Sequence, residues 1–547
     1  MNEDMPSLQT SNRLNRRQLL LNGGMAATFF GLQSCTSTIR SRLGLSGDSA
    51  TELNIESEEA DSGLLRIALS SAPGQLDPAS AFTMESSQVL LAAYDSLVKV
   101  DRRLRPQPML AEGWQVSEDL LTWTFFLRQQ VVFHHNRLFT ADDVVFTFNR
   151  LKDPVLRSPL FPALSIVDTV KEVDDFTVEF NLTAPYMDLP LLLGAAQARI
   201  VSRSYDESLL RSQPSGTGPF IVTQVNPGES IKFKRNPKYW LEERPDLMAG
   251  QPVYPIEEMH HIYMPAIEDQ ANALLKGQVD LIPNIGIQYI DEFKTSSEVE
   301  IVSIDSGAYQ TVVMQAIRPP FSDVRVRQAI KHCLDRSAMQ DTILRGHGEL
   351  GNDHPIAPVF PFAANLPIRE HNISLAKDLL TAAGYPDGID LDLITSTTRP
   401  GMTELAESVA EMTRPANIRV RVIAVPADVY WSDYAGRVPF HIGNWNLRPT
   451  VDETLMLAYH STSNGNEGYW ADPKLDRWIE QARSEPDPEK RQALYSRAQE
   501  LIKEEGAVAI PVFRPIMSAV STRVKNFFPH PAGWLDLRGV QVTSLPA

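Results

Sequence analysis

Histidine pairs are the residues of this chain whose chemistry could bind a metal ion. His134-His135 and His260-His261 are adjacent pairs, and His347 and His354 lie close together in one segment. Imidazole nitrogens bind zinc and nickel well. Adjacent residues in a strand point to opposite faces, so neither adjacent pair is expected to hold one ion. His347 and His354 could converge, but they lack the close ligand spacing of known sites. We therefore expect no metal site.

A glycine-rich run raises the possibility of cofactor chemistry. Gly346 to Gly351 matches the G-x-G-x-x-G pattern of dinucleotide binding. That pattern requires a strand before it and a helix after it, because the helix N-terminus holds the pyrophosphate. Here a helical run, Ala338 to Leu344, comes before and Pro355 follows soon after. The chain also lacks the GxSxG, P-loop and HExxH patterns. We expect no cofactor and no enzyme activity.

Composition sets limits on the class of protein. The chain has 547 residues, a net charge of −17 and 43% hydrophobic residues, which is enough for two or three domains with their own cores. The acidic balance argues against nucleic acid as a partner. Cys35 and Cys333 are the two cysteines, so the chain has no disulfide framework. Cys333 lies in an apolar helical run and is expected to be a small buried hydrophobe.

Strands and helices alternate through the second half of the chain, which favours an α/β fold. The alternation of apolar residues predicts strands at Ile389 to Ile394, Ile418 to Val425 and Phe440 to Trp445. Asp472-Pro473 and Asp487-Pro488 each place an N-cap before proline in the first turn of a helix.

Residues 111–150 predict two strands, a turn and a capped helix. Apolar residues occupy alternate positions in the strand that begins at Leu121, which gives it one apolar face: Leu121, Trp123, Phe125 and Leu127. Val131 to Phe133 is expected to pair back. Asn136 tolerates the positive φ of a turn. Thr140 and Asp143 have the spacing of a capping box at the start of the helix.

The identities of these residues resemble the signature of the peptide/nickel-type, family 5 solute-binding proteins of ABC importers. That signature runs A-E-x-W, S-x-D, T-W/Y-T-F-x-L-R, V-x-F-H and T-A-x-D-V-x-F. The matching residues are Ala111, Glu112 and Trp114; Ser117 and Asp119; Thr122 to Leu127 with Arg128; Val131, Phe133 and His134; and Thr140, Ala141, Asp143, Val144 and Phe146. His135-Asn136 replaces the usual Asp-Gly turn. Gly216 to Phe220, Arg235 to Trp240 and elements between Pro319 and Arg336 also resemble the family.

The resemblance covers nearly the whole chain after its export signal and implies a fold. It implies an α/β, two-lobed, periplasmic-binding-protein-like fold of type II with an extra domain inserted in the first lobe. We expect lobe I to comprise residues 63–85, 212–310 and 514–547, the extra domain residues 86–211, and lobe II residues 311–513. The chain is expected to cross between the lobes near Tyr309 to Gln315, and Ala507 to Phe513 is expected to be the returning strand.

A loop after a strand of lobe II is where the resemblance implies ligand recognition. In the peptide-binding members, a Trp here is followed three residues later by an Asp that pairs with the α-ammonium of a peptide. Trp445 matches the Trp, and Arg448 stands in place of the Asp. We hypothesise that Arg448 binds an acidic group; alternatively, it forms a salt bridge to Asp452 or to the opposite lobe. Trp445 could stack on a ligand or wall the cleft, and Tyr309 and Gln315 are further candidates.

The N-terminus resembles an export signal over residues 1–34. Asn15 to Leu20 resembles a twin-arginine motif, with Sec export as the alternative, and the following apolar run is too short and interrupted to be a good membrane span. Leu32 to Cys35 resembles a lipobox with Cys35 as the lipidated residue; the alternative is a plain export signal with an incidental cysteine. Residues 35–62 are Ser-rich and then acidic, which is typical of a flexible tether.

We therefore expect a monomeric, lipid-anchored, extracytoplasmic substrate-binding component of an ABC importer, periplasmic or at the cell surface. It would capture a peptide or peptide-like solute, acidic if the Arg448 hypothesis holds, by hinge closure, and deliver it to a membrane permease. Alternatives on the same fold are a metal or metal-chelate carrier and a sensory receptor that signals rather than transports.

Overall fold

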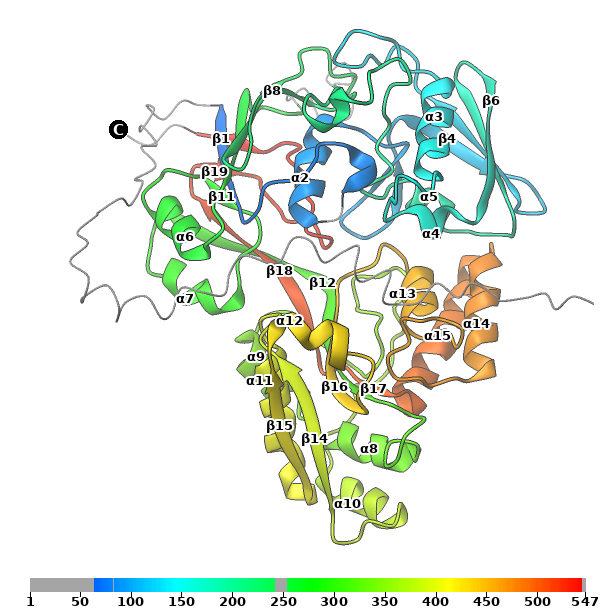
Figure 1. Ribbon diagram of the computed structural model, residues 1–547, viewed down its shortest axis with the longest axis vertical. Coiled ribbons are helices and arrows are strands. Elements are labelled where there is room, and N and C mark those ends of the chain that lie inside the picture. Colours follow the sequence, from blue (N-terminus) through cyan, green and yellow to red (C-terminus); the bar gives the residue numbers. More distant parts are fainter. Residues whose placement is uncertain (1–62, 82, 242–252, 544–547) are drawn as a thin grey trace, which may run out of the picture.

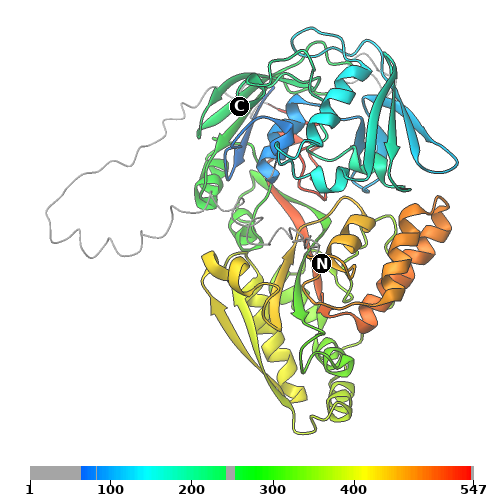
Figure 2. The same cartoon turned by 45° about the vertical axis from the view of Figure 1, so that its right-hand side comes forward.

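A mixed sheet joins two lobes in the computed structural model, which describes residues 63–81, 83–241 and 253–543 (Figure 1). The order of its strands is β15-β14-β16-β12-β18-β11-β1-β10-β9-β8, with β13 pairing with β18 and β17 with β12. Figure 2 shows the same two lobes from another side, with the crossing strands between them. The predicted export signal, the tether and Cys35 lie outside the described residues.

Each lobe has its own strands and helices. Lobe I contains β1 (Leu64–Leu69), β8 (Phe220–Asn226), β9 (Ser230–Arg235), β10 (Glu258–Tyr263), β11 (Leu281–Ile282), α6 (Ile267–Leu275) and α7 (Ile290–Phe293), with β19 (Val524–Lys525) and β20 (Gln541–Val542) beside them. Lobe II contains β13 (Glu349–Leu350), β14 (Ile389–Ser396), β15 (Ile418–Val425), β16 (Phe440–Trp445), β17 (Val508–Ala509), α8 (Val324–Cys333), α9 (Arg336–Leu344), α10 (Ile373–Ala382), α11 (Met402–Thr413), α12 (Ala427–Val429), α13 (Val451–Ala458), α14 (Pro473–Ser484) and α15 (Pro488–Glu505).

Two long antiparallel strands, β12 (Val299–Met314) and β18 (Val512–Ser521), carry the chain from lobe I into lobe II and back. Their pairing is interrupted by a register shift between Ile304 and Ala308, and such irregularities bend strands. The predicted crossing near Tyr309 to Gln315 lies at the end of β12, which already begins at Val299. The returning strand predicted for Ala507 to Phe513 overlaps β17, which pairs with β12, and the first residues of β18, but β18 continues along β12 to Ser521.

The extra domain is built on a separate four-stranded sheet, β4-β5-β7-β6. Its elements are β2 (Val98–Val100), β3 (Pro106–Pro108), β4 (Ala111–Val116), β5 (Thr122–Leu127), β6 (Val167–Asp174), β7 (Thr177–Leu182), α3 (Ala141–Leu151), α4 (Phe161–Leu164) and α5 (Leu189–Leu192). Trp123, Phe125 and Leu127 are buried on one face of β5, as their alternation predicts. The capping box of Thr140 and Asp143 is confirmed at the start of α3.

Helix α2 (Met84–Ala93) connects the extra domain to lobe I. The helix begins at Met84 because Thr83 caps it: the Thr83 hydroxyl oxygen accepts a hydrogen bond from the amide of Ser86 at 3.1 Å. Val89 packs into the core of lobe I, whereas Leu90 packs beside Val201 of the extra domain. The domain boundaries given above remain predictions, and the one at residue 86 falls inside this helix.

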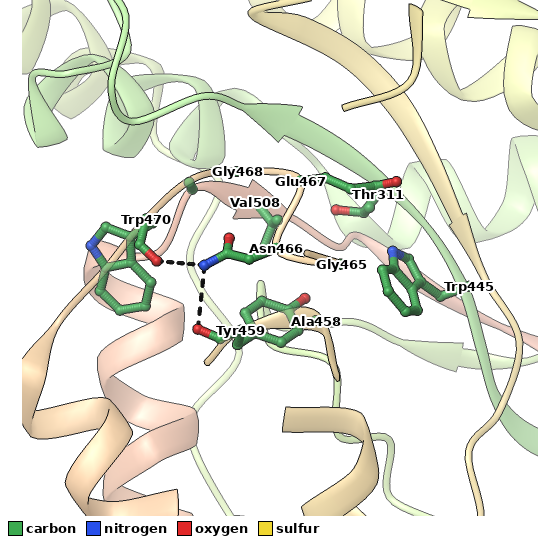
Figure 3. A pocket seen from close by; sticks show the side chains of 11 residues that line it. Thr311, Trp445, Ala458, Tyr459, Gly465, Asn466, Glu467, Gly468, Trp470 and Val508 are labelled. Atoms are coloured by element: carbon green, nitrogen blue, oxygen red, sulfur yellow. Dashed lines mark hydrogen bonds between the residues drawn. The ribbon is translucent and has the colours of Figure 1, made fainter. Parts of the chain in front are cut away.

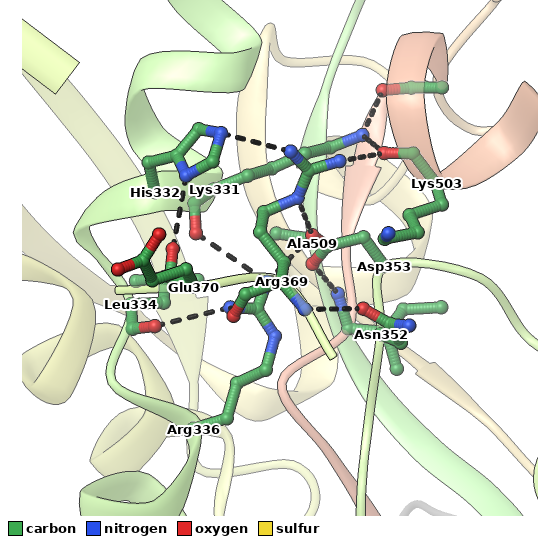
Figure 4. A network of polar contacts seen from close by, with 12 residues as sticks. Lys331, His332, Leu334, Arg336, Asn352, Asp353, Arg369, Glu370, Lys503 and Ala509 are labelled. Carbon is green, nitrogen blue, oxygen red and sulfur yellow. Dashed lines mark hydrogen bonds and ion pairs between the residues drawn. The ribbon is translucent and has the colours of Figure 1, made fainter. Parts of the chain in front are cut away.

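Asp353 is the centre of a buried ionic network in lobe II (Figure 4). Its carboxylate accepts hydrogen bonds from Arg336 at 2.6 Å and Arg369 at 2.9 Å. Lys331 is fully buried and donates to the carbonyl oxygen of Gly506 at 2.9 Å, just after α15. Burial would raise the pKa of Asp353, but the surrounding cations outweigh it and lower that pKa. Because these charges satisfy one another, the network fixes α8, α9 and α15 as one unit.

The extra domain also packs against lobe II. Leu104 and Leu191 share a buried apolar cluster with Leu455 of α13 and with residues of α14 and α15. Beside this cluster, Asp188 forms an ion pair with Arg491 at 2.7 Å, and both side chains are less than one-tenth exposed. Helix α5 is a single turn, and just before it the amide of Met187 donates to the carbonyl oxygen of Arg483 at 3.0 Å, which ties the extra domain to α14.

An interlobe cavity as the candidate binding site

A cavity of about 740 Å³ lies between the two lobes. Lobe I lines it with the end of β1, with α2 and with the segments around α6 and residues 282–289. Lobe II lines it with the end of α9, the loop before α11 and Asn446. This volume falls in the range of pockets that bind small molecules, roughly 300–1,000 Å³.

One face of the crossing strands forms the wall of the cavity between the lobes. Ala308 and Gln310 of β12 and Arg514 and Ile516 of β18 are all part of its lining. They share a face because side chains alternate along a strand, and Ala308 stands opposite Arg514 in the register. The small side chain of Ala308 leaves room above this position for the longer arginine.

The loop between β14 and α11 brings a second arginine to the cavity. Gln310 is buried and its side-chain nitrogen donates to the carbonyl oxygen of Pro400 at 2.7 Å, which holds the loop against β12. Gly401 follows with a φ of +89°, and a Cβ there would lie 2.9 Å from the Gln310 side-chain oxygen. A glycine is therefore needed for this close approach. The arrangement fixes Arg399, the neighbour of Pro400, at the mouth of the cavity.

Charges of both signs line the cavity. Arg345 forms an ion pair with Asp291, and Glu85 accepts a hydrogen bond from Ser70 at 2.7 Å. Arg514 differs, because burial and then the nearby Arg399 lower its pKa to about 10. Its Nε atom is buried and has no hydrogen-bond partner within the described part of the chain. The cavity can therefore attract a ligand oxygen that carries negative charge.

Trp445 and Tyr309 lie on the face of the sheet opposite the cavity wall. They are paired in register across β12 and β16, and Tyr309 also packs edge-on against Phe513, with ring centroids 5.9 Å apart. Trp445 lines a separate, much smaller pocket of about 10 Å³ together with Tyr459 and Gly465 (Figure 3). That volume is close to the minimum that one water molecule needs.

Arg448, Asp452 and Gln315 also lie outside the lining of the interlobe cavity. The Arg448 guanidinium is 3.8 Å from Glu453, so its nearest recorded carboxylate is neither of the two alternatives predicted above. Gln315 follows the end of β12 at the far side of lobe II, buried, with neither side-chain polar atom hydrogen-bonded to the described residues. Binding of solute by the five residues chosen from sequence remains a prediction.

Asp452 lies instead at the contact between lobe II and the extra domain. Its carboxylate is 3.6 Å from the Arg483 Nε atom and is 2% exposed. Burial raises the pKa of Asp452 to about 7; Arg483 opposes this rise and Asp188 adds to it. Arg483 also lies over the ring of Tyr186 in the extra domain, with the guanidinium carbon 4.9 Å from the ring centroid. Asp452 therefore belongs to an interdomain charge cluster.

His134 and His135 make hydrogen-bond contacts within the extra domain and its border with lobe I. His134 and His135 both contact the turn before β8: His134 Nε2 lies 3.0 Å from the carbonyl oxygen of Gly218, and His135 Nδ1 lies 2.8 Å from the Ser215 hydroxyl. Over the described ranges, no group of three or more His, Cys, Asp or Glu is arranged to hold a metal ion. Cys333 is fully buried, as predicted. Among the helices that the structure describes, none is long and apolar enough to cross a membrane.

Sequence reasoning missed Gln310, Arg399, Asn446 and Arg514. Each had a local signal. Gln310 lies in the predicted crossing segment, and Arg399 follows a predicted strand of lobe II, where ligand-binding loops occur. Arg514 is a single charge within an otherwise apolar strand, and such a charge requires a partner.

Two lobes joined by a pair of crossing strands, with a ligand-sized cavity between them, define the class of protein as a two-lobed receptor for a small solute. The comparisons with known proteins give the family. The model for bacterial extracellular solute-binding proteins, family 5, matches residues 105–467. This chain belongs to that family, and the predicted two-lobed fold of type II with an extra domain is confirmed.

Relatives in this family carry several ligand names. Heme-binding protein A of Haemophilus influenzae is 26% identical over 507 residues, which cover 86% of this chain and 90% of that protein. The dipeptide-binding protein of Escherichia coli K12 is 26% identical over 475 residues, which cover 80% of this chain and 86% of that protein. Among solved structures, HbpA2 from Haemophilus parasuis has a TM-score of 0.78 at 24% identity, covering 88% of this chain and all of that one. DppA from Helicobacter pylori, in complex with the peptide STSA, has a TM-score of 0.68 at 22% identity, and the match covers 88% of this chain and 98% of that one.

Proposed function

We propose that this protein is the substrate-binding component of an ABC importer and captures a peptide or peptide-like solute in the cavity between its lobes. The observation that carries the proposal is the cavity itself, which has the volume of a small-molecule site and is lined by both lobes. Membership of the extracellular family 5 and the dipeptide-binding relatives support the class of ligand.

The mechanism follows from the crossing strands. A solute that contacts both walls of the cavity stabilises the arrangement in which the lobes are closest, because it has more contacts there. Rotation would take place at β12 and β18, where the register shift interrupts regular pairing. A membrane permease would then recognise the closed receptor and accept the solute unchanged. This cycle of capture and release requires no chemical step.

The N-terminal segment supplies the second half of the proposal. We propose that the chain is exported, lipidated at Cys35 and held at the membrane by residues 35–62 as a monomer. Support comes from the twin-arginine-like and lipobox-like motifs. Cys35→Ser is expected to release the protein from the membrane fraction, while the solute affinity of the released domain stays unchanged. Membrane association that persists in this variant would contradict the anchor.

Small-angle scattering with defined dipeptides tests solute capture. L-alanyl-L-alanine and larger dipeptides are added to the purified protein, and the radius of gyration is expected to fall as the lobes close. Ser70→Trp places a large ring in the cavity and is expected to abolish the change. Ser297→Trp, on the exposed surface of lobe I, is the matched control. The proposal fails if no dipeptide compacts or thermally stabilises the protein, or if mass spectrometry shows that the peptides are converted to products.

A further inference from the structure

Arg514 differs from Arg345, another arginine of the cavity, because no acidic partner is recorded for it within the part of the chain that the structure describes. Its side chain lies on the cavity face of β18, opposite Ala308. Within the described residues, it makes no ion pair within 4.0 Å, and no hydrogen-bond partner is recorded for its buried Nε. Several partly buried arginines are paired with carboxylates: Arg66 and Arg523 both contact Asp280, and Arg150 contacts Asp77. Arg199 and Arg327 also have no ion pair among the described residues, but Arg199 donates to the Ser96 hydroxyl at 3.0 Å and Arg327 to the carbonyl oxygen of Phe321 at 2.6 Å.

The charges around Arg514 increase this imbalance. Arg399 is close enough to lower the pKa of Arg514, and it makes no ion pair with the described residues either. Its recorded side-chain hydrogen bond goes to the backbone oxygen of Thr398 at 3.0 Å. Glu404 also lines the cavity, but it is exposed and lies beyond ion-pair distance of both arginines. Two guanidinium groups therefore face the same part of the cavity.

Such an arrangement is unfavourable for the protein by itself. A charged group removed from water costs free energy unless an opposite charge or hydrogen bonds compensate it, and two like charges add to the cost. Functional sites are where proteins retain such unfavourable arrangements, because the ligand supplies the compensation. A guanidinium presents a planar fork of donors that matches the two oxygens of a carboxylate or a phosphate.

We propose that the solute bound in this cavity carries an anionic oxygen group, a carboxylate or a phosphate, at the end that lies against β18, and that Arg514 binds this group with Arg399 as a second cation. The inference rests on the proposed function, because it assigns a chemical class to the solute of the same cavity. It moves the anion-binding role from Arg448, which sequence favoured, to an arginine whose side chain reaches the cavity.

Calorimetric titration with matched probes tests the role of Arg514. The probes are L-alanyl-L-alanine, its C-terminal amide, succinate and inorganic phosphate. The wild-type protein is expected to bind the free acid more tightly than the amide. Arg514→Gln is expected to lose about tenfold or more in affinity for the anionic probes, because a charge-assisted hydrogen bond is removed, while the weak affinity for the amide stays unchanged. Comparison of succinate with phosphate identifies which anion the site prefers.

Two further variants separate binding from folding. Arg514→Lys keeps the charge but loses the planar fork, so a smaller loss of affinity is expected. Arg421→Gln removes an exposed arginine that pairs with Asp392 outside the cavity, and its affinities should equal those of the wild type. In the absence of ligand, Arg514→Gln should unfold at the same temperature as the wild type or higher, because the lost charge has no partner. A lower unfolding temperature would indicate a structural role and contradict the proposal.

The outcomes distinguish this inference from the proposed function. If dipeptides bind equally well to the wild type and to Arg514→Gln, the inference is wrong and peptide capture stands. If dipeptides do not bind but succinate or phosphate does, and Arg514→Gln abolishes that binding, the inference stands and the peptide class is wrong. If none of the four probes binds to the wild type, both are wrong.

Discussion

The two sides of the crossing strands differ in how a buried arginine is compensated. On one side the extra domain packs against α13 to α15, and its Asp188 neutralises Arg491 at 2.7 Å. On the other side the lobes leave a cavity of about 740 Å³, where Arg514 has no acidic partner within the described residues. On the first side the chain itself supplies the opposite charge, whereas we propose that on the second side the solute supplies it. This contrast separates a contact between the extra domain and lobe II from the surface that we propose binds the solute.

The largest expected effect is on the packed side. Asp188→Ala removes the carboxylate beside Arg491, whose pKa is raised because Asp188 outweighs the effect of burial. Loss of one member of a buried pair leaves an uncompensated charge and costs about 3 kcal/mol or more. We expect the free energy of unfolding to fall by about this amount in a guanidinium titration.

A double variant provides the control for this pair. Asp188→Leu with Arg491→Met removes both charges and is expected to recover most of the lost stability, because neither charge is then buried alone. If Asp188→Ala alone changes stability by less than about 0.5 kcal/mol, the contact contributes little and the two sides of the strands do not differ as described.

A smaller effect, which depends on pH, is expected at Asp452. Its pKa of about 7 in the folded protein lies above the ordinary value of 3.8. Between these two values the folded protein holds a proton that the unfolded chain has released, so stability falls as pH rises through this window and levels off above it. Relative to Asp452→Asn, the wild type should therefore lose about 2–3 kcal/mol of stability between about pH 5 and about pH 8.

Thermal unfolding of both proteins across this pH range measures the difference. Because the two chains share every other titrating group, the difference between their curves reports Asp452 alone. Curves that run parallel would show that Asp452 has the same pKa in the folded and unfolded chains. The solute affinity of Asp452→Asn should be close to that of the wild type, since Asp452 does not line the cavity.

The smallest effect is expected at Arg448. Its side chain is 40% exposed and lies 3.8 Å from Glu453 outside the cavity lining, although its Nε is buried and has no recorded partner among the described residues. Its ion pair with Glu453 is expected to contribute little to stability. Because Arg448 does not line the cavity, Arg448→Ala should change the affinity for L-alanyl-L-alanine by about twofold or less. The hypothesis from sequence instead predicts a loss of about tenfold. Calorimetry on Arg448→Ala and Arg514→Gln with the same peptide decides which arginine binds the anion.

Local patterns in the sequence predicted local structure well. The capping box of Thr140 and Asp143 and the strand from Phe440 to Trp445 were both predicted, because each depends on neighbours along the chain. The family fold followed from the signature between Ala111 and Arg150.

The site was harder to predict because it depends on the register between distant strands. Trp445 and Tyr309 were chosen as cleft residues, but both lie on the face opposite the cavity wall. A shift of one residue along a strand changes the face on which a side chain lies. Gln310 and Asn446, the next residues along the chain, line the cavity instead. Sequence alone pointed to two segments that line the cavity but could not choose the face on which each side chain lies.

The break in pairing between Ile304 and Ala308 lies next to Arg514, so the arginine that we propose binds the anion stands where we propose that the lobes rotate. A ligand bound at the rim of a cleft acts far from the hinge, whereas a ligand bound beside the hinge acts where the rotation of both lobes begins. A slight twist at this point is amplified toward the far tip of lobe II, where α10 lies (Figure 1). A fluorescent reporter attached at that tip would therefore be a sensitive gauge of solute capture.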